Sequence, residues 1–213
     1  MPAERLNREV LRRFWANKAQ TASNRWTGDR VLEFELAMLR HLVPAGAAIL
    51  DLGSGHGELS RKLCPPDGRL VAVDWEAGFS TAFTAPQHSF VTETVTDYEP
   101  SALFDVALLF GVVTSLELRE EEEVYDKISR CLKSHGVAVV KNQCANADEF
   151  VVDGYSEALG TFYSGRYPSR SDQLARLTAR FGAVEPLDYP ADLNPWPESG
   201  HVAFLCHNPA SGR

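Results

Sequence analysis

Three glycines at alternate positions follow a short apolar run early in the chain. The stretch reads AAILDLGSGHGELS from Ala47 to Ser60 and contains Gly53, Gly55 and Gly57. Glycine has no Cβ, so such a loop can turn sharply and let a ligand lie against the backbone. Backbone N–H groups at the start of a following helix favour a polar or anionic ligand group. The spacing therefore predicts a ligand-binding loop between a buried strand and a helix.

Two classes of ligand use glycine-rich loops of this kind. A dinucleotide-binding loop reads GxGxxG, and here Glu58 stands where its third glycine would be. An acid in the loop would face a pyrophosphate badly, whereas it suits a ligand that carries an ammonium group. The pattern GxGxG, preceded by Asp51, therefore disfavours a nicotinamide-dependent dehydrogenase. Such an enzyme would bind NAD and be protected by it.

After Gly46, short apolar runs alternate with helical segments, which predicts an α/β fold with a doubly wound, mostly parallel sheet and helices on both faces. Strands are expected at 47–52, 69–74, 89–95, 104–110, 136–143, 183–189 and 201–207. The link between the last two leaves no room for a helix, so the last strand is expected to be antiparallel. Helices are expected at about 4–19, 32–43, 58–64, 120–132 and 171–181, with Ser171 as the N-cap of the last.

The ordered motifs resemble those of class I S-adenosylmethionine-dependent methyltransferases. ILDLGSGHG is similar to the family's first motif, LVAVDWE ends the second strand with an acid, and FDVALLFGVV and LKSHGVAVVKNQ resemble the fourth and fifth motifs. The likeness covers about residues 47–143. It implies the family's Rossmann-like fold with seven strands, S-adenosylmethionine as methyl donor and S-adenosylhomocysteine as product. A metal is not expected, because His and acidic residues do not cluster at metal-ligand spacing.

The resemblance also implies which residues hold the cofactor. Asp74 lies 21 residues after Gly53 and is placed to accept hydrogen bonds from both ribose hydroxyls. Asp97 stands where the family often holds the adenine amino group. Aromatic residues could pack on the adenine, although aromatics near strand ends are as often core. The expected cofactor site comprises Asp51, Gly53, Ser54, Gly55, Gly57, Asp74, Trp75, Asp97, Tyr98, Phe110 and Arg25.

Two regions are expected to hold the methyl acceptor. In the first, Lys141 follows four small or apolar residues at the end of a strand, and its ammonium either reaches solvent or holds an anionic group. The second is 144–170, an insertion of weak periodicity that interleaves tyrosines with arginines and suits a lid over a polar or anionic molecule. The expected acceptor site comprises Lys141, Gln143, Tyr163, Arg166, Arg170 and Trp15. No motif identifies a catalytic base.

A single domain is expected over 1–213, with an N-terminal helical lid (1–45), a cofactor-binding core (46–143), the insertion (144–170) and a closing helix with two strands (171–213). The 213 residues suffice for a hydrophobic core. With 21 Lys and Arg against 29 Asp and Glu, the net charge of −8 disfavours nucleic acid and membranes as partners. Four scattered cysteines, and the lack of a signal peptide or of an apolar run of about 18 residues, favour a cytoplasmic protein.

These features predict an enzyme that methylates a small polar or anionic molecule, most readily on oxygen, in bacterial secondary or carbohydrate metabolism. The pattern loosely resembles small bacterial natural-product methyltransferases, and a phosphonate acceptor would suit Lys141, Arg166 and Arg170. Two alternatives remain open: N-methylation of a small amine, and a non-catalytic methyltransferase-fold protein that binds a partner through an exposed apolar patch. A homodimer is also left open.

Overall fold

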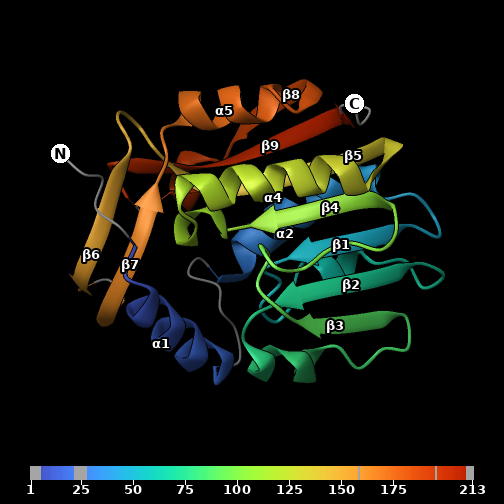
Figure 1. Cartoon of the computed structure of the whole chain (residues 1–213), viewed down its shortest axis with the longest axis horizontal. Helices are drawn as coiled ribbons and strands as arrows, with labels where there is room; N and C mark the ends of the chain where they lie inside the picture. Colours follow the sequence, from blue (N-terminus) through green and yellow to red (C-terminus); the bar gives the residue numbers. More distant parts are fainter. Residues whose placement is uncertain (1–5, 22–27, 158, 195, 210–213) are drawn as a thin grey trace.

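The structure, a computed structural model, describes residues 6–21, 28–157, 159–194 and 196–209. Its centre is a seven-stranded sheet in the order β3-β2-β1-β4-β5-β9-β8 (Figure 1). The strands are β1 (Ala48–Leu52), β2 (Arg69–Asp74), β3 (His88–Thr92), β4 (Phe104–Phe110), β5 (Leu132–Ala145), β8 (Phe181–Asp188) and β9 (Ser199–Pro209). The pairs among β1–β5 are parallel, whereas β9 runs antiparallel to both β5 and β8. The expected doubly wound sheet with an antiparallel last strand is confirmed.

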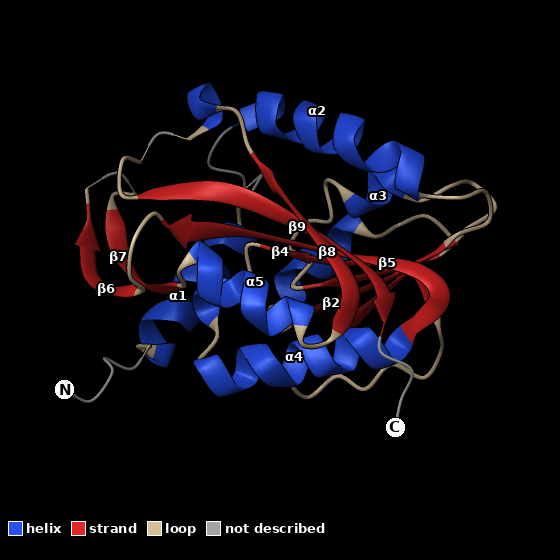
Figure 2. Cartoon of the chain, turned by 90° about the horizontal axis from the view of Figure 1, so that it is seen from above, coloured by secondary structure: helices blue, strands red, loops and turns tan. Residues whose placement is uncertain are grey.

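Helices cover both faces of this sheet (Figure 2). One face carries α2 (Gly28–Leu39) and α3 (Ser60–Leu63), and the other carries α4 (Leu118–Cys131) and α5 (Arg170–Thr178). Two apolar clusters fill the spaces between the layers, one with α2 and α3 and one with α4 and α5. Every residue of β1 is buried, as expected for a parallel strand covered on both faces. None of the described helices is long and apolar enough to cross a membrane.

Residues 144–170 differ from the expected irregular insertion. β5 continues to Ala145, and a separate two-stranded antiparallel sheet follows, formed by β6 (Phe150–Ser156) and β7 (Thr161–Tyr167). Each of these strands contains a glycine, and both lack the continuous apolar runs of the central strands, which is why the pattern alone did not predict them. The N-cap of α5 is Ser169, whose side chain accepts a hydrogen bond from the Asp172 N–H, so the expected cap at Ser171 is wrong.

The β6–β7 hairpin and α1 (Arg8–Ala19) lie together beyond the carboxyl ends of β1, β2 and β4, at the left of Figure 1. The two are in contact, because the ring centroids of Phe14 on α1 and Tyr163 on β7 are 5.2 Å apart. This pair of elements, which we call the cap, covers the edge of the sheet where a doubly wound fold binds its ligand.

Candidate active site

A cavity of about 650 Å³ lies between the cap and the carboxyl ends of the central strands. Its floor comes from the loops that follow β1, β2 and β4 and from the last residues of β5, and its roof comes from α1, β6 and β7. β1 and β4 are neighbours in the sheet although they are not consecutive in sequence, so the strand order reverses here. This reversal is the position at which open α/β sheets bind small molecules.

The glycine loop forms one wall of the cavity and is bound to the end of β2. The N–H groups of Gly53 and Ser54 both donate to the carbonyl of Val73, at 2.8 and 3.0 Å. Gly53, Gly55 and Gly57 all have positive φ, at 72°, 53° and 61°. Other residues rarely adopt this left-handed conformation, and a Cβ on Gly53 would lie 2.2 Å from Cγ2 of Val112. The loop conformation therefore requires glycine, as its sequence indicated.

Asp74 ends β2 and is aimed at the same loop. Its Oδ2 accepts a hydrogen bond from the Gly55 N–H at 2.9 Å, and its Oδ1 accepts one from the Glu76 N–H at 3.0 Å. The side chain is 8% exposed and lines the cavity. Burial raises the pKa of this carboxyl, while the two N–H donors oppose the rise. Because each carboxylate oxygen can accept a second hydrogen bond, Asp74 can hold the loop and still bind ribose hydroxyls.

Most of the other expected cofactor residues also line the cavity. They are Asp51, Gly53, Ser54, Gly57, Trp75 and Phe110. The guanidinium of Arg12 from α1 lies 5.9 Å from the centroid of the Trp75 ring, so the cap contacts this end of the site directly. Gly55 is not among the described lining residues, but its N–H donates to Asp74, which lines the cavity. Arg25 lies outside the described residues.

Asp97 and Tyr98 are not among the described residues that line the cavity. Asp97 is exposed, and its carboxylate accepts a hydrogen bond from Thr94 Oγ1 at 2.7 Å within a turn. Tyr98 packs against the core on the α4 side. The structure gives no support to the expected adenine contact of Asp97, because this aspartate stabilises a turn, a common role for the residue. Thr94, Val95 and Thr96 face the cavity instead.

These positions give a prediction about the cofactor end. Replacing Asp74 by alanine removes a hydrogen bond to the loop and the carboxylate expected to accept from the ribose, so we expect S-adenosylhomocysteine to bind less tightly by about 1–3 kcal/mol. The matched change Asp97→Ala should leave the affinity unchanged, because that carboxylate lies outside the cavity. Calorimetric titration of both variants measures the difference. Equal affinities for the two variants would mean that β2 does not end at the ribose.

The acceptor end of the cavity lies beside β5 and contains four of the expected residues: Lys141, Gln143, Trp15 and Tyr163. Lys141 and Gln143 share one face of the strand because side chains alternate. The Gln143 amide donates to Ser199 Oγ at 2.6 Å. The Lys141 ammonium lies 5.6 Å from the centroid of the Tyr189 ring. Lys141 therefore lies in the cavity. This is the position that it would need in order to hold an anionic group rather than reach solvent.

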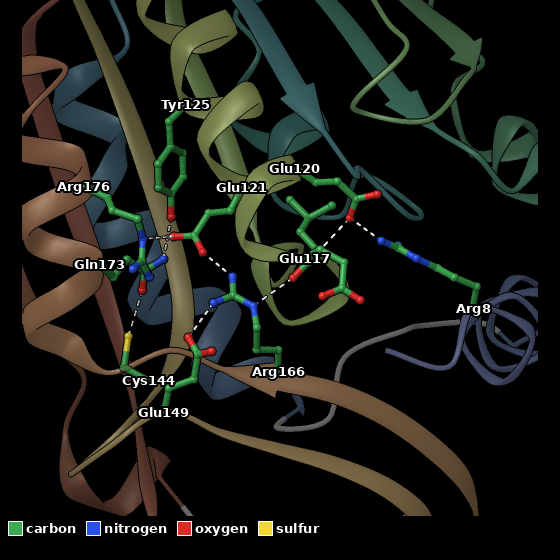
Figure 3. Close-up of polar contacts among 11 residues, drawn as sticks. Arg8, Glu117, Glu120, Glu121, Tyr125, Cys144, Glu149, Arg166, Gln173 and Arg176 are labelled. Atoms are coloured by element: carbon green, nitrogen blue, oxygen red, sulfur yellow. Dashed lines mark hydrogen bonds and ion pairs between the residues drawn. The ribbon is translucent and has the colours of Figure 1, made fainter. Parts of the chain in front are cut away.

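Arg166 and Arg170 are not among the described residues that line the cavity, so the structure does not support their expected contact with the acceptor. Arg166 is 3% exposed, donates to the Leu116 carbonyl at 2.9 Å and pairs with Glu121 and Glu149 (Figure 3). Burial opposes its charge, but the two glutamates outweigh burial and raise the pKa of the guanidinium. Arg170 begins α5 and pairs with Asp188 at 3.0 Å. Both arginines already have carboxylate partners, so neither needs an anionic ligand.

The acidic start of α4 anchors both parts of the cap. Arg8 of α1 pairs with Glu120, and Arg166 of β7 pairs with the next residue, Glu121 (Figure 3). Glu121 is fully buried and also accepts a hydrogen bond from Arg176 of α5 at 3.0 Å. The arginine that sequence analysis assigned to the acceptor therefore positions the roof of the cavity.

Glu35, Trp196 and His201 are among the cavity residues that the sequence did not indicate. His201 lies opposite Gln143 in the β5–β9 pairing, and its ring is 5.6 Å from that of Tyr189. Burial and then the charge of Lys141 lower the pKa of His201 to about 3, so the imidazole is neutral at ordinary pH. The expected antiparallel last strand could have indicated this residue, because it starts beside the end of the fifth strand. Glu35 gave no comparable signal, since it lies within an apolar helix.

Comparisons with known proteins agree with this architecture. Residues 50–140 match the sequence model of a protein family described as a methyltransferase domain. Among curated proteins, none matches the sequence. The matched segment runs from β1 to β5. It therefore contains the glycine loop, Asp74 and the residues at the end of β4 that line the cavity floor.

Solved structures share the fold over nearly the whole chain. A 1,6-didemethyltoxoflavin-N1-methyltransferase of Burkholderia thailandensis, with that compound and S-adenosylhomocysteine bound, is 18% identical, with 98% of this chain and 93% of that one covered and a TM-score of 0.76. DhpI in complex with SAH is 16% identical, with coverages of 95% and 97% and a TM-score of 0.69. The N-terminal domain of EvdMO1, with SAH and D-fucose, is 14% identical, with coverages of 94% and 96% and a TM-score of 0.67.

The sheet order, the glycine loop at its reversal point and the matched family segment all agree with the resemblance found in the sequence. Residues 50–140 match the methyltransferase-domain model, and the chain has the Rossmann-like fold of the class I S-adenosylmethionine-dependent methyltransferases.

Proposed function

We propose that this chain transfers the methyl group of S-adenosylmethionine to an oxygen atom of a small molecule whose reacting group carries one negative charge. The observation that carries the proposal is the continuity of the cavity, which joins Asp74 and the glycine loop to Lys141 without leaving the space beneath the cap. The volume of about 650 Å³ lies within the range of roughly 300–1,000 Å³ typical of small-molecule sites.

The cofactor half is supported by residue chemistry and by the likeness to known proteins. The left-handed glycines bring backbone close to a ligand, and Asp74 offers carboxylate oxygens to a ribose. The solved relatives include complexes with S-adenosylhomocysteine, SAH and SAM. We infer that S-adenosylmethionine lies with its ribose on Asp74 and its sulfonium toward β5.

The acceptor half favours a single negative charge. Lys141 supplies a cation that stabilises an ionised hydroxyl or carboxylate, whereas Arg166 and Arg170 are committed to Glu121, Glu149 and Asp188. With both arginines paired to carboxylates of the protein, a doubly charged acceptor such as a phosphonate is no longer favoured. Arg12 lies at the Trp75 end of the cavity and Arg8 pairs with Glu120, so among the described lining residues Lys141 is the cation beside β5, and a molecule with one ionisable oxygen fits its charge.

Methyl transfer from a sulfonium is an in-line displacement that depends chiefly on positioning. The bond between the methyl carbon and sulfur breaks, its electron pair stays on sulfur, and the acceptor oxygen forms the new bond to carbon. His201 is a weak base because its pKa is about 3. We propose that the acceptor reacts as its own anion, ionised beside Lys141, so that no protein group has to remove its proton.

The experiment is incubation of the protein with methyl-labelled S-adenosylmethionine and a panel of small phenols, hydroxy acids and amines, followed by NMR of the product. A new C–O bond in an acidic hydroxy compound supports the proposal. A new C–N bond would favour N-methylation, the activity named for the Burkholderia relative. Binding of S-adenosylhomocysteine without transfer to any compound would favour the non-catalytic alternative.

A further inference from the structure

Buried polar atoms without a partner gather at the acceptor end of the cavity. Among the described residues, eight buried side-chain atoms have no hydrogen-bond partner, and four of them belong to Asn142, Ser115 and His201. All three residues line the cavity. Folded proteins leave few buried donors and acceptors unpaired because each one costs free energy. Their concentration at this end indicates that a ligand supplies the missing partners.

Asn142 is the most unusual of these residues. It is 0% exposed, and both its Nδ2 and its Oδ1 lack a partner within the described part of the chain. It lies on the opposite face of β5 from Lys141 and Gln143, toward the short helix η3 (Val113–Ser115). η3 lies against β5 and β7, and Ser115 is its last residue. Two neighbouring elements thus each bring an unpaired polar group to one wall of the cavity.

The edge of β5 explains how one ligand can reach both faces of the strand. The pairing of β4 with β5 ends at Phe110 and Lys141, whereas β5 itself continues to Ala145. Between Lys141 and Ala145, which bridges to Ser169, no described strand pairs with this edge of β5, and Asn142 and Gln143 line the cavity there. A flat molecule lying along the edge would have Lys141 and Gln143 on one side and, once the buried Asn142 side chain turns toward it, Asn142 on the other.

The chemistry of an amide limits what can satisfy Asn142. Its side chain presents a donor N–H and an acceptor oxygen side by side, so a matching ligand offers an acceptor and a donor side by side. The amide edge of a lactam does this. A carboxylate would satisfy Nδ2 but would place negative charge against Oδ1. Phe150 and Tyr167, whose stacked rings are 4.7 Å apart with 13° between their planes, add aromatic surface to the same cavity.

We propose that the methyl acceptor is a flat lactam-type ring whose amide edge hydrogen-bonds to Asn142, with Ser115 beside it. This inference rests on the proposed function and deepens it, since the ionised oxygen of the same ring would be the group held by Lys141. Asn142 is then the residue that determines which ring the site accepts.

The first test asks whether the Asn142 amide serves the fold or a ligand. Asn142→Leu removes two unpaired polar atoms at similar volume, so we expect a melting temperature equal to or above that of the wild type. The control is Gln173→Leu, because Gln173 is equally buried but its amide bonds to the Tyr125 hydroxyl at 2.8 Å and accepts from Cys144 Sγ at 3.0 Å. That variant should melt lower. A comparable loss for Asn142→Leu would overturn the inference.

The second test uses a matched pair of probes, 4-hydroxy-2-quinolone and 4-hydroxycoumarin, which differ by a lactam N–H against a lactone oxygen. Each is titrated calorimetrically into the complex with S-adenosylhomocysteine, at a pH where both hydroxyl groups are ionised. The lactam should bind at least about tenfold more tightly to the wild type, because the lactone leaves Asn142 Oδ1 unpaired. In Asn142→Leu this preference should disappear while S-adenosylhomocysteine binds normally.

Equal binding of the two probes to the wild type, a preference that survives in Asn142→Leu, or no binding of the lactam at millimolar concentration would each overturn the inference. In all three cases the proposed function survives, provided that S-adenosylhomocysteine binds and an acidic hydroxy compound is methylated. Failure of S-adenosylhomocysteine to bind the wild type would contradict the proposed function and this inference together.

Discussion

Replacing Arg166 by methionine is expected to lower the free energy of unfolding by about 3–5 kcal/mol, the usual cost of breaking a buried ion pair from one side. The change leaves the fully buried Glu121 with Arg176 as its remaining arginine and takes a partner from Glu149. It also removes the hydrogen bond to the Leu116 carbonyl. Urea unfolding at a fixed pH measures the loss.

Arg170→Met is the matched control. That arginine is half-exposed and pairs with an exposed aspartate, Asp188, so the expected loss is less than about 1 kcal/mol. The double change Glu121→Leu with Arg166→Met should not restore stability, because it leaves the largely buried Arg176 without the carboxylate with which it pairs. Similar losses for Arg166→Met and Arg170→Met would contradict the assignment of Arg166 to a buried network that holds the cap.

Replacing Lys141 by methionine is expected to reduce kcat/KM for the acceptor by about ten- to a hundredfold, or roughly 1.5–3 kcal/mol, the value of a charge-assisted hydrogen bond. The affinity for S-adenosylhomocysteine should change little, because Asp74 and the glycine loop are untouched. Steady-state kinetics and calorimetry separate the two effects. Lys62→Met is the control: Lys62 is exposed and is not among the described residues that line the cavity.

The pH dependence gives a second measurement on the same variant. A nearby cation favours the ionised form of the bound acceptor and so lowers its pKa. Removing Lys141 should therefore move the rise of kcat to higher pH. His201 should add no inflection near neutrality, since its pKa is about 3. Normal turnover with an unshifted profile would mean that the acceptor does not ionise beside Lys141.

The sequence predicted the parts of the fold and site that depend on local pattern. The apolar runs and the glycines at positive φ located the central strands, the loop, Asp74 and Trp75. For Asp97 the sequence was a weak guide, because an aspartate in a turn looks the same in sequence whether or not a ligand is near. Its true neighbours depend on the path of the turn, which no spacing rule specifies.

The acceptor residues depend on tertiary contacts, and here the sequence was a poorer guide. The sequence assigned Arg166 to an anionic ligand. In the structure the guanidinium pairs instead with the carboxylate of Glu121, which lies 45 residues earlier in the chain. His201 reaches the cavity only because β9 pairs with β5. An arginine between tyrosines does not reveal whether its carboxylate partner belongs to the protein or to a substrate, since both satisfy the same hydrogen bonds.

The central claim is that one cavity holds S-adenosylmethionine on the glycine loop and presents its methyl group to β5. A crystal structure of the protein with S-adenosylhomocysteine tests this most directly. The account predicts hydrogen bonds from both ribose hydroxyls to the Asp74 carboxylate and a sulfur atom that faces the space beside Lys141. A ligand bound elsewhere, or a ribose that lies away from Asp74 with the sulfur turned from β5, would contradict it.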